Sequence, residues 1–500
     1  MNSTRALTKI ETDLVVVGGG GAGLAAAAEA AKLGLSVLVL EKAERLGGTT
    51  ALSVGSIMAA QSGMQKRAGI EDTPEAHADD LDSIIQAMGI DDDPELRKLL
   101  TENVAETIEF LRSIGVNFLG PLPQPPHTIS RLHQVMPTSR AYIFRLERHC
   151  RKLGVAFRLA TKAVKLRTNG KEVVGVEARN ADGLLEVSAS AGVLLSSGDI
   201  GGNASMMHTY MKNWLDGIEV YNPLNTGDGQ QMAAEAGARI VPRKDLGAEI
   251  AAHLRFVLPK RSFLQMIPPY PWVTRTMVWA MKWMPEWLIR PFMMKFLTTT
   301  LGPDMGIYKQ GAILVNTQGD RFADEMKNPN LHVAKQPEGK AYIVFDERFA
   351  KQFSQWPHFI STAPGVAFAY VGDYRSSRPD LFNKADSIDG LAAKLGFSAE
   401  RLGAAFSEVN GDREEDLRLQ APPFYALGPV KLYVMVAPVG LAVNKRFEVL
   451  NEAGNAISGL YAAGGAGQAG FTITGHGHGL GWAFTTGRLA ARSAASRLRK

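Results

Sequence analysis

Two short apolar runs and one helical stretch open the chain. Residues 13–17 read DLVVV, a β-branched run of the kind that a strand buried in a parallel sheet needs. A glycine-rich turn follows at 18–23, and the alanine-rich stretch 24–34 predicts a helix that ends at Gly34. A second apolar run at 36–40 predicts another strand. The order strand, turn, helix, strand predicts a βαβ unit and an α/β fold.

The glycines of this turn have the spacing GxGxxG. Gly18 permits the tight turn, Gly20 lets a pyrophosphate approach the backbone, and Gly23 lets helix and strand pack closely. The N-terminus of the helix then faces the phosphates. Glu41 ends the second strand, 23 residues after Gly18, where a carboxylate accepts the ribose hydroxyls and repels a 2′-phosphate. A lone glycine turn is common, but the complete unit predicts a dinucleotide site.

The most unusual pattern spans residues 268–296, which we call the Trp/Met segment. It holds four of the seven tryptophans, and Trp279, Trp283 and Trp287 are spaced by four, although Pro285 should interrupt a helix there. Its cations outnumber its acids: Arg275, Lys282, Arg290 and Lys295 stand against Glu286. Such a composition is typical of an amphipathic segment that seeks an interface. Three interpretations stay open: a cap helix packed on the core, a membrane-surface anchor, or an apolar entrance for a bulky ligand.

The composition is that of a globular protein with several domains. Five hundred residues suit two or three domains, and 45% hydrophobic with 21% charged residues excludes disorder as the main state. The single cysteine, Cys150, excludes a disulfide framework, a thiolate-bound iron–sulfur cluster and a c-type haem, and we expect it to be an inert core residue. A net charge of +5 without a basic stripe argues against nucleic acid as a partner.

The sequence also bears on compartment and metals. It has no apolar signal core at its start and no apolar run of about 18 residues, the length that would suggest a spanning helix. We therefore expect a cytoplasmic protein, with peripheral membrane contact through the Trp/Met segment as one possibility. No cluster of metal ligands accompanies the histidines, so we expect no metal site.

A second glycine turn indicates a long dinucleotide. Residues 44–56, ERLGGTTALSVGS, place hydroxyl residues beside the first turn, which suits a cofactor whose ribityl chain and ring run onward. Here the sequence resembles the fumarate reductase/succinate dehydrogenase flavoprotein superfamily, of the FAD-binding 2 type, with soluble fumarate reductases and 3-ketosteroid dehydrogenases as the nearest-looking branches. Further blocks match in order over nearly the whole chain: RLH at 131–133, TKAV at 161–164, VLLSSG at 193–198, NTGDG at 225–229, GAILVNTQGDRFADE at 311–325, GLYAAG at 459–464 and GHGHGLGWAFTTGR at 475–488.

The resemblance implies a Rossmann-like FAD-binding domain of the glutathione-reductase type. This domain is expected to be discontinuous, at 8–245 and 437–500, with an α+β capping domain inserted at 246–436. The chain carries one dinucleotide fingerprint and no separate NAD(P)H-binding half. Electrons would therefore pass to or from an external partner, such as a quinone.

The resemblance also implies which residues hold FAD. The first strands and turns contribute Gly18, Gly20, Gly21, Ala22, Gly23, Glu41, Lys42, Gly47, Gly48, Thr49, Thr50 and Ser53. The later blocks contribute Ala163, Val164, Ser197, Gly198, Asp228, Gly464, Gly479 and Leu480. Residues 47–53 contain no histidine, where covalent-flavin members carry one, so we expect FAD to be bound non-covalently.

The segments that clamp a dicarboxylate in the fumarate reductase branch differ here. Two carboxylates need cations in bidentate geometry, and that branch supplies a histidine and an arginine. Residues 435–440 read MVAPVG, without histidine, and 475–481 read GHGHGLG, without arginine, which disfavours fumarate and succinate. In the ketosteroid branch a tyrosine and a glycine N–H face a ketone. Gly477 matches that glycine, but Ile473 stands in the tyrosine's place, so the polar substitutes are Thr474, His476 and His478.

Four residues are candidates for catalysis: His476, His478, Tyr308 and Arg321. Transfer of hydrogen across a C–C bond needs a proton acceptor or donor, and hydrogen-bond donors that stabilise an enolate. The two histidines flank Gly477 at the start of the flavin-side helix. Arg321 stands where the fumarate reductase branch has its proton-donating arginine, with Glu325 next in the relay, and Tyr308 stands where that branch has a relay arginine. Both cap residues also fit a purely structural role.

We therefore expect an FAD-dependent dehydrogenase, or its reverse ene-reductase. Its substrate would be the CH–CH bond beside the carbonyl of a lipophilic, cyclic molecule such as a 3-ketosteroid. Two alternatives stay open: a reductase of small unsaturated acids with a rebuilt clamp, and a flavin electron-transfer subunit without its own substrate.

Overall fold

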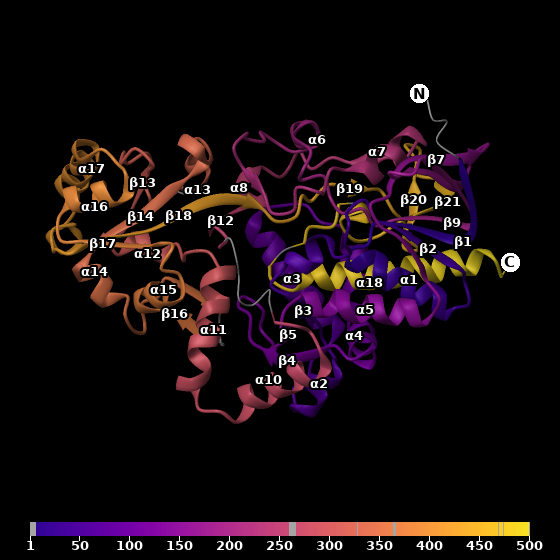
Figure 1. Ribbon diagram of the computed structural model, residues 1–500, viewed down its shortest axis with the longest axis horizontal. Coiled ribbons are helices and arrows are strands. Elements are labelled where there is room, and N and C mark those ends of the chain that lie inside the picture. The colour runs from indigo at the N-terminus through magenta and orange to yellow at the C-terminus, as the bar shows by residue number, and fades with distance from the viewer. Residues whose placement is uncertain are drawn as a thin grey trace.

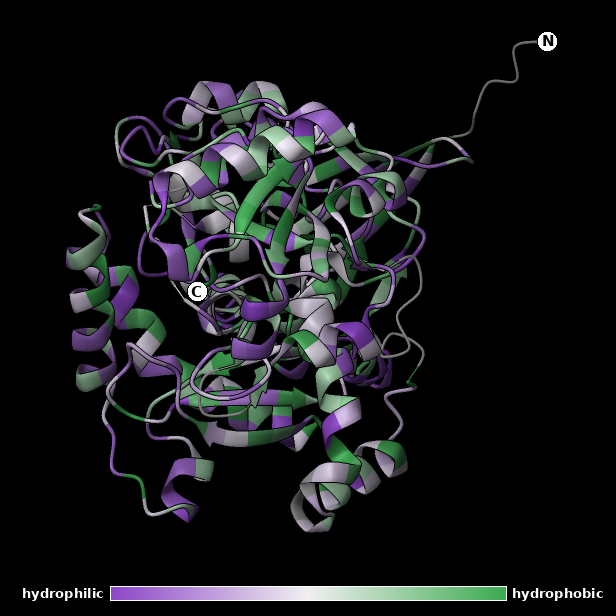
Figure 2. Ribbon diagram, turned by 90° about the vertical axis from the view of Figure 1, so that its left-hand side faces the viewer, coloured by the Kyte–Doolittle hydropathy of each residue, from purple (hydrophilic) through white to green (hydrophobic). Residues whose placement is uncertain are grey.

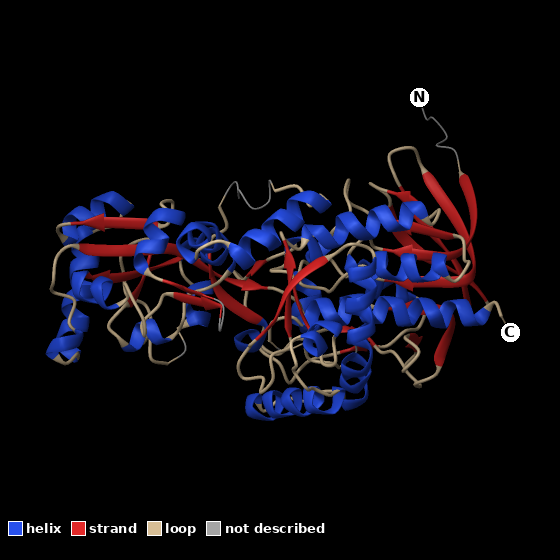
Figure 3. Cartoon of the chain, turned by 90° about the horizontal axis from the view of Figure 1, so that it is seen from below, coloured by secondary structure: helices blue, strands red, loops and turns tan. Residues whose placement is uncertain are grey.

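The computed structural model describes residues 7–259, 267–327, 329–363, 367–468, 470–473 and 475–499. The molecule is elongated, and two large sheets lie toward its opposite ends, joined through a central region (Figure 1). Figure 2 shows hydrophobic strands on the inside and outer helices that mix hydrophilic and hydrophobic residues. Helices surround both sheets (Figure 3).

The first sheet has eight strands, in the order β20-β21-β9-β1-β2-β6, with β8 on β9 and β7 on β8. They are β1 (Thr8–Val17), β2 (Val37–Leu40), β6 (Ala156–Arg158), β7 (Lys162–Asn169), β8 (Glu172–Arg179), β9 (Leu184–Leu195), β20 (Glu448–Leu450) and β21 (Ala456–Ala462). The strands β21, β9, β1, β2 and β6 run parallel, so their carboxyl ends meet at one edge. The expected strands at 13–17 and 36–40 are confirmed, because Leu14 to Val17 pair with Val37 to Leu40.

Helices lie around this sheet and the small sheet described below. They are α1 (Gly21–Lys32), α2 (Gly63–Arg67), α3 (Pro74–Met88), α4 (Pro94–Ser113), α5 (Arg140–Lys152), α6 (Ala204–Tyr210), α7 (Asp228–Glu235) and α18 (His478–Arg497). A Cβ on Gly487 of α18 would lie 2.2 Å from the carbonyl oxygen of Ala22, so this glycine lets α18 lie directly on α1. Cys150 is fully buried in α5, its thiol donates to the carbonyl of Leu24, and burial raises its pKa to about 12. The expectation that Cys150 lies in the core is confirmed.

The second sheet has the order β10-β18-β14-β13, with β12 and β17 also on β18. Its strands are β10 (Glu219–Val220), β12 (Ala252–Phe256), β13 (Ile313–Asn316), β14 (Ala341–Asp346), β17 (Phe382–Ala385) and β18 (Phe424–Val434). Around it lie α8 (Ala248–Ala251), α12 (Gly306–Lys309), α13 (Asn330–Ala334), α14 (Glu347–Gln352), α15 (Val371–Ser377), α16 (Ile388–Leu395) and α17 (Ala399–Asp412). We call this part the cap. β10 falls within the range expected for the FAD domain but pairs with β18 of the cap sheet.

A small sheet and two helices lie between these parts. The small sheet is β3-β5-β4, made of β3 (Ser56–Met58), β5 (Leu132–Met136) and β4 (Asn117–Leu122). The Trp/Met segment forms α10 (Pro271–Trp283) and α11 (Glu286–Thr300) at the lower edge of the molecule in Figure 1. The helices separate at Met284 and Pro285, as Pro285 predicted. No helix in the described ranges is long and apolar enough to cross a membrane.

Candidate active site

The three motif glycines of the first turn have three different surroundings. Gly18 has a φ of +108°, and a Cβ there would lie 2.4 Å from the carbonyl oxygen of Ser196. A Cβ on Gly23 would lie 2.0 Å from the carbonyl oxygen of Gly18, so only glycine lets α1 approach β1 this closely. A Cβ on Gly20 would meet nothing nearer than the Cα of Gly48, at 3.9 Å. Gly20 thus borders an open space at the N-terminus of α1, where an anion is favoured.

The second glycine turn closes this space from the other side. Gly20 and Gly47 form an isolated β-bridge, and a short 3₁₀ helix runs from Gly48 to Leu52. The hydroxyl of Thr50 accepts a hydrogen bond from the backbone N–H of Gly21 at 3.1 Å, which ties the second turn to the start of α1. The two turns therefore form one cradle of backbone groups.

An acid and two lysines lie at the ends of β2 and β7. The carboxylate of Glu41 accepts hydrogen bonds from the backbone N–H groups of Gly19 at 2.7 Å and Ala43 at 2.8 Å, and each oxygen keeps a second lone pair for a ribose hydroxyl. Lys42 pairs with Asp228 at 2.7 Å, and Lys162 pairs with the same carboxylate at 2.9 Å. Ala163 and Val164 follow on β7.

The far end of the cradle carries hydroxyl groups. The hydroxyl of Thr49 accepts from the side-chain amides of Asn222 and Asn225, each at 3.0 Å, and Ser53 donates to the carbonyl of Thr50 at 2.9 Å. The Ser197 hydroxyl, at the end of β9, is a buried oxygen for which the described residues supply no hydrogen-bond partner. A buried polar group is rarely left unpaired, so Ser197 is open to a ligand.

The start of α18 completes the site. Gly464 donates its N–H to the hydroxyl of Thr486 at 2.9 Å, and its carbonyl accepts from the indole N–H of Trp482 at 3.0 Å. These bonds fix the end of β21 against α18, whose first turn holds Gly479 and Leu480. Ala22 touches this corner, because a Cβ on Gly464 would lie 2.9 Å from the Cβ of Ala22. Gly198 lies across the same edge at the end of β9, with a φ of +83°.

The structure thus brings the expected FAD residues of β1, β2, β7, β9, β21, α1, α7 and α18 to one edge of the first sheet. Three features of this edge fit an elongated dinucleotide. The space beside Gly20 suits a pyrophosphate, Glu41 suits a ribose, and the unpaired hydroxyl of Ser197 suits the region beyond the phosphates.

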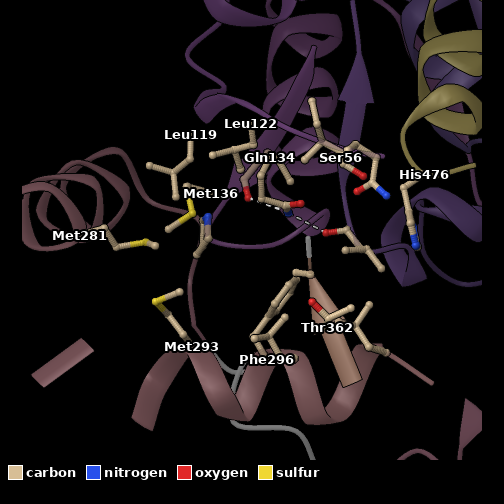
Figure 4. Close-up of a pocket in the computed structure, with 18 of the residues that line it drawn as sticks. Ser56, Leu119, Leu122, Gln134, Met136, Met281, Met293, Phe296, Thr362 and His476 are labelled. Atoms are coloured by element: carbon tan, nitrogen blue, oxygen red, sulfur yellow. Dashed lines mark hydrogen bonds between the residues drawn. The ribbon is translucent and has the colours of Figure 1, made fainter. Parts of the chain in front are cut away.

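A mostly apolar pocket lies between the small sheet and the Trp/Met helices (Figure 4). One wall comes from β4 and β5, including Leu119, Leu122 and Met136. The other wall comes from Met281 of α10 and from Met293 and Phe296 of α11. Its polar side chains within the described ranges are Ser56, Gln124, Gln134, Thr362 and His476. The sequence pointed to the α10 and α11 wall as one of three interpretations, but it gave no sign of the β4 and β5 wall.

His476 lies at the side of the pocket next to α18 (Figure 4). Desolvation by the surrounding protein lowers the pKa of His476 to about 4, and the positive charges of Arg255 and of protonated His253 lower it further. His476 is therefore neutral at pH 7. Arg255 and His253 were not anticipated from the sequence. They project from the same side of β12, and only the alternating pattern AHLRF at 252–256 could have indicated that side.

His478 points away from the pocket into a buried histidine cluster. Its Nε2 shares a hydrogen bond of 3.0 Å with Nε2 of His77, and the ring of His127 lies 5.1 Å from its own ring. Beside the cluster, the buried guanidinium of Arg131 donates two hydrogen bonds to Asp72, at 2.7 and 2.8 Å, and another to Asp80. The expected pair of histidines is thus split, because α18 begins at His478 and turns its ring inward. Thr474 lies outside the described residues.

Tyr308 and Arg321 lie in the cap and do not line the pocket. Tyr308 is buried in the apolar core of the cap, and burial, aided by the charge of Glu325, raises its pKa above the usual range. Arg321 pairs with Glu325 at 2.8 Å and with Glu408 at 2.7 Å, while Glu325 accepts from the backbone of Leu314 at 3.0 Å. In this arrangement both residues lie within the cap, Arg321 in ion pairs and Tyr308 in the core, and their part in catalysis stays a prediction.

Comparison with known proteins adds three findings. A NADH:fumarate oxidoreductase of Klebsiella pneumoniae (strain 342) is 28% identical over 474 residues, which cover 90% of this chain and 44% of that protein. The chain therefore spans less than half the length of that relative. The structure of the open conformation of a flavocytochrome c3 fumarate reductase superposes with a TM-score of 0.73 at 24% identity, over 98% of this chain and 79% of that one. The structure of a 3-ketosteroid delta1-dehydrogenase from Sterolibacterium denitrificans superposes with a TM-score of 0.68 at 19% identity, over 97% of this chain and 99% of that one.

These structural likenesses show that the chain shares its overall α/β fold with both proteins. A family model described as an FAD binding domain matches residues 13–266 and 271–481, which is most of the chain. The protein therefore belongs to the FAD-binding 2 flavoprotein superfamily of oxidoreductases, and its cofactor is FAD.

Proposed function

We propose that this protein transfers hydrogen across a C–C bond beside the carbonyl group of a lipophilic, cyclic ketone such as a 3-ketosteroid. The observation that carries the proposal is the apolar pocket with His476 at its side. A largely apolar wall with few polar groups is typical of sites for lipophilic small molecules. The dicarboxylate clamp expected for fumarate is missing from 435–440 and 475–481.

The size of the pocket limits how such a substrate would lie. The pocket has a volume of about 120 Å³ and is partly open to solvent. Pockets for drug-sized ligands usually measure about 300–1,000 Å³. A steroid-sized molecule would therefore place only its ketone end in the pocket, beside His476, and extend through the opening.

His476 and Arg255 are proposed to hold the carbonyl oxygen. A neutral imidazole donates one N–H, and a guanidinium donates several. Both donations grow stronger as negative charge develops on that oxygen, so they would stabilise an enolate more than the ketone. Arg255 already donates one N–H to the carbonyl of Thr300, which holds the guanidinium in place and leaves other N–H groups available. Bound FAD supplies the hydride acceptor or donor, and an external partner, such as a quinone, completes the electron transfer.

A second candidate is the reduction of an unsaturated carboxylic acid. Arg255 favours it, because no carboxylate in the described part of the chain pairs with this half-buried guanidinium. A substrate carboxylate could fill that role, with His253 and His476 beside it. Fumarate, the substrate named for the Klebsiella relative, is the simplest acid to test.

Anaerobic flavin spectroscopy distinguishes these candidates. The purified yellow protein would be mixed in turn with saturated 3-ketosteroids, simple cyclic ketones and succinate, while the visible band of oxidised flavin is followed. The dithionite-reduced protein would be offered the corresponding enones and fumarate. Bleaching or reoxidation by the ketone pair supports our proposal, whereas a response to the acids alone supports the second candidate. No response to any of them would contradict both and favour an electron-transfer subunit.

We expect His476→Ala to lower kcat by about 10²- to 10³-fold, because it removes one donor to the developing oxyanion. The FAD content should stay unchanged, since His476 lies on the pocket side of the site. His208→Ala, at a surface histidine paired with Asp216, serves as the matched control and should retain activity. Equal kcat values for the two variants would remove His476 from the mechanism.

We also propose that FAD is not covalently attached. Precipitation of the holoprotein with acid should leave a yellow, fluorescent supernatant and a colourless pellet. The reason is the sequence of residues 47–53, which offers no histidine for a covalent flavin bond. A yellow pellet would show a covalent linkage and refute this expectation.

A further inference from the structure

The outer sides of α10 and α11 carry an exposed aromatic surface, which we call the tryptophan face. It consists of Trp272, Trp279, Trp283 and Trp287, with Met284 and Leu288 beside them. The four tryptophan side chains are 69%, 59%, 67% and 71% exposed, respectively. Large apolar patches are rare on soluble monomers and usually mark an interaction site. The tryptophan face therefore has the character of an interaction site.

The inner sides of the same helices are already used. Met281 of α10 and Phe292, Met293 and Phe296 of α11 line the pocket. The two helices are thus apolar on both sides, with the pocket within and the tryptophan face outside. Packing against the protein core explains the inner residues but leaves the outer tryptophans unexplained.

Basic residues border the tryptophan face. Arg275 is exposed on α10, and Arg148, Arg151 and Lys152 are exposed on the neighbouring α5. The two helices touch where the ring of Phe144 meets that of Tyr270, with centroids 5.8 Å apart. Burial lowers the pKa of Arg145 in α5, and the charges of Arg148 and Arg275 lower it further. Glu147 is the one acid of α5 and pairs with Arg151 at 2.8 Å, and the five basic residues Arg140, Arg145, Arg148, Arg151 and Lys152 leave this helix with a net positive charge.

The positive charge of this surface distinguishes between two binding partners, a second copy of the chain and an anionic bilayer. In a symmetric dimer the same patch would face itself, so two patches of net positive charge would be brought together. An anionic bilayer offers the complementary charge, and tryptophan is the side chain that prefers the boundary between headgroups and acyl chains. The helices have 13 and 15 residues, fewer than the roughly 20 that a spanning helix needs, so they suit the membrane surface.

We propose that the tryptophan face docks on the surface of an anionic lipid bilayer. The tryptophans and Leu288 would enter the headgroup boundary, and the basic residues of α5 and α10 would meet lipid phosphates. Docking would place the wall of the pocket against the lipid, so that a lipophilic molecule could pass between bilayer and pocket without crossing water. The proposal concerns binding alone and does not depend on the reaction proposed above.

Flotation with vesicles tests this proposal on the holoprotein. Wild-type protein should bind phosphatidylcholine vesicles that contain phosphatidylglycerol and bind pure phosphatidylcholine vesicles much more weakly, and added salt should weaken binding. The variant Trp279→Ser/Trp283→Ser/Trp287→Ser should bind at least about 100-fold more weakly. The variant Arg148→Gln/Lys152→Gln should lose about 30-fold on anionic vesicles, since each basic residue contributes about fivefold.

A matched control keeps the result interpretable. Met326→Ser alters an equally exposed apolar residue in the cap, 59% exposed, and should bind like wild type. FAD content and the unfolding midpoint should be unchanged in every variant, because the substituted side chains lie at the surface. Absence of wild-type binding, or unchanged binding by the tryptophan variant, would overturn the proposal. Loss of a dimer in the tryptophan variant, without any vesicle binding by the wild type, would assign the face to a second copy instead.

Discussion

Replacing Gly20 by alanine is expected to leave the apoprotein folded and to weaken FAD binding by about 10²- to 10⁴-fold. The new methyl group would find its nearest neighbour, the Cα of Gly48, at 3.9 Å, which is ordinary contact. The backbone at Gly20 has φ −79° and ψ −173°, a conformation that alanine adopts without strain. The methyl would occupy the space into which the pyrophosphate must move, and so prevent one or two charge-assisted hydrogen bonds, each contributing about 1.5–3 kcal/mol.

Titration of the apoprotein with FAD, followed by flavin fluorescence, measures this effect. Gly372→Ala is the matched control, since a Cβ there would meet no described atom within 4 Å and the residue lies in the cap. The control should bind FAD like wild type. Wild-type affinity in Gly20→Ala would mean that the phosphates do not approach this glycine.

Arg131→Met is expected to lower the free energy of unfolding by about 3–5 kcal/mol. Arg131 and Asp72 have fully buried side chains joined by a bidentate ion pair, and Asp80 is bound to the same guanidinium. Methionine roughly keeps the volume but leaves two carboxylates without their cation. Burying such charges unpaired is strongly unfavourable, so the variant should unfold at lower denaturant concentration.

Urea unfolding of the apoprotein, followed by circular dichroism, tests this expectation. Arg112→Met removes the guanidinium from an exposed pair with Glu109, and it should change the unfolding free energy by less than about 1 kcal/mol. If Arg131→Met were no more destabilising than Arg112→Met, the buried network would contribute little to the fold. The double variant Asp72→Asn/Arg131→Met should recover part of the loss, because it removes one of the uncompensated charges.

The first βαβ unit could be predicted because its signals are local. Gly18, Gly20 and Gly23 lie within six residues, and their three environments match the roles that the spacing indicates. The break at Pro285 is local for the same reason, since proline cannot continue a helix hydrogen bond. The cradle followed from these signals together with the family resemblance.

The chemistry of the pocket could not be predicted in the same way, because it depends on distant contacts. His478 meets His77 across 401 positions of the chain, and nothing near either residue in sequence marks the meeting. Arg255, on a strand of the cap, lowers the pKa of His476. The pocket wall from β4 and β5 consists of residues that look like ordinary core residues in the sequence. Tyr308 and Arg321 matched motif positions, yet packing and ion pairs hold them inside the cap.

The lone thiol has a practical consequence for experiments on this protein. Cys150 is fully buried and its high pKa keeps it protonated, so maleimide reagents, which attack the thiolate, should leave it unmodified in the folded state. A cysteine introduced on the outer side of α10 would then be the single position open to a dye, with the native sequence otherwise intact. Environment-sensitive or distance-reporting probes could therefore be placed on the tryptophan face, and on the cap opposite it, without first constructing a cysteine-free background.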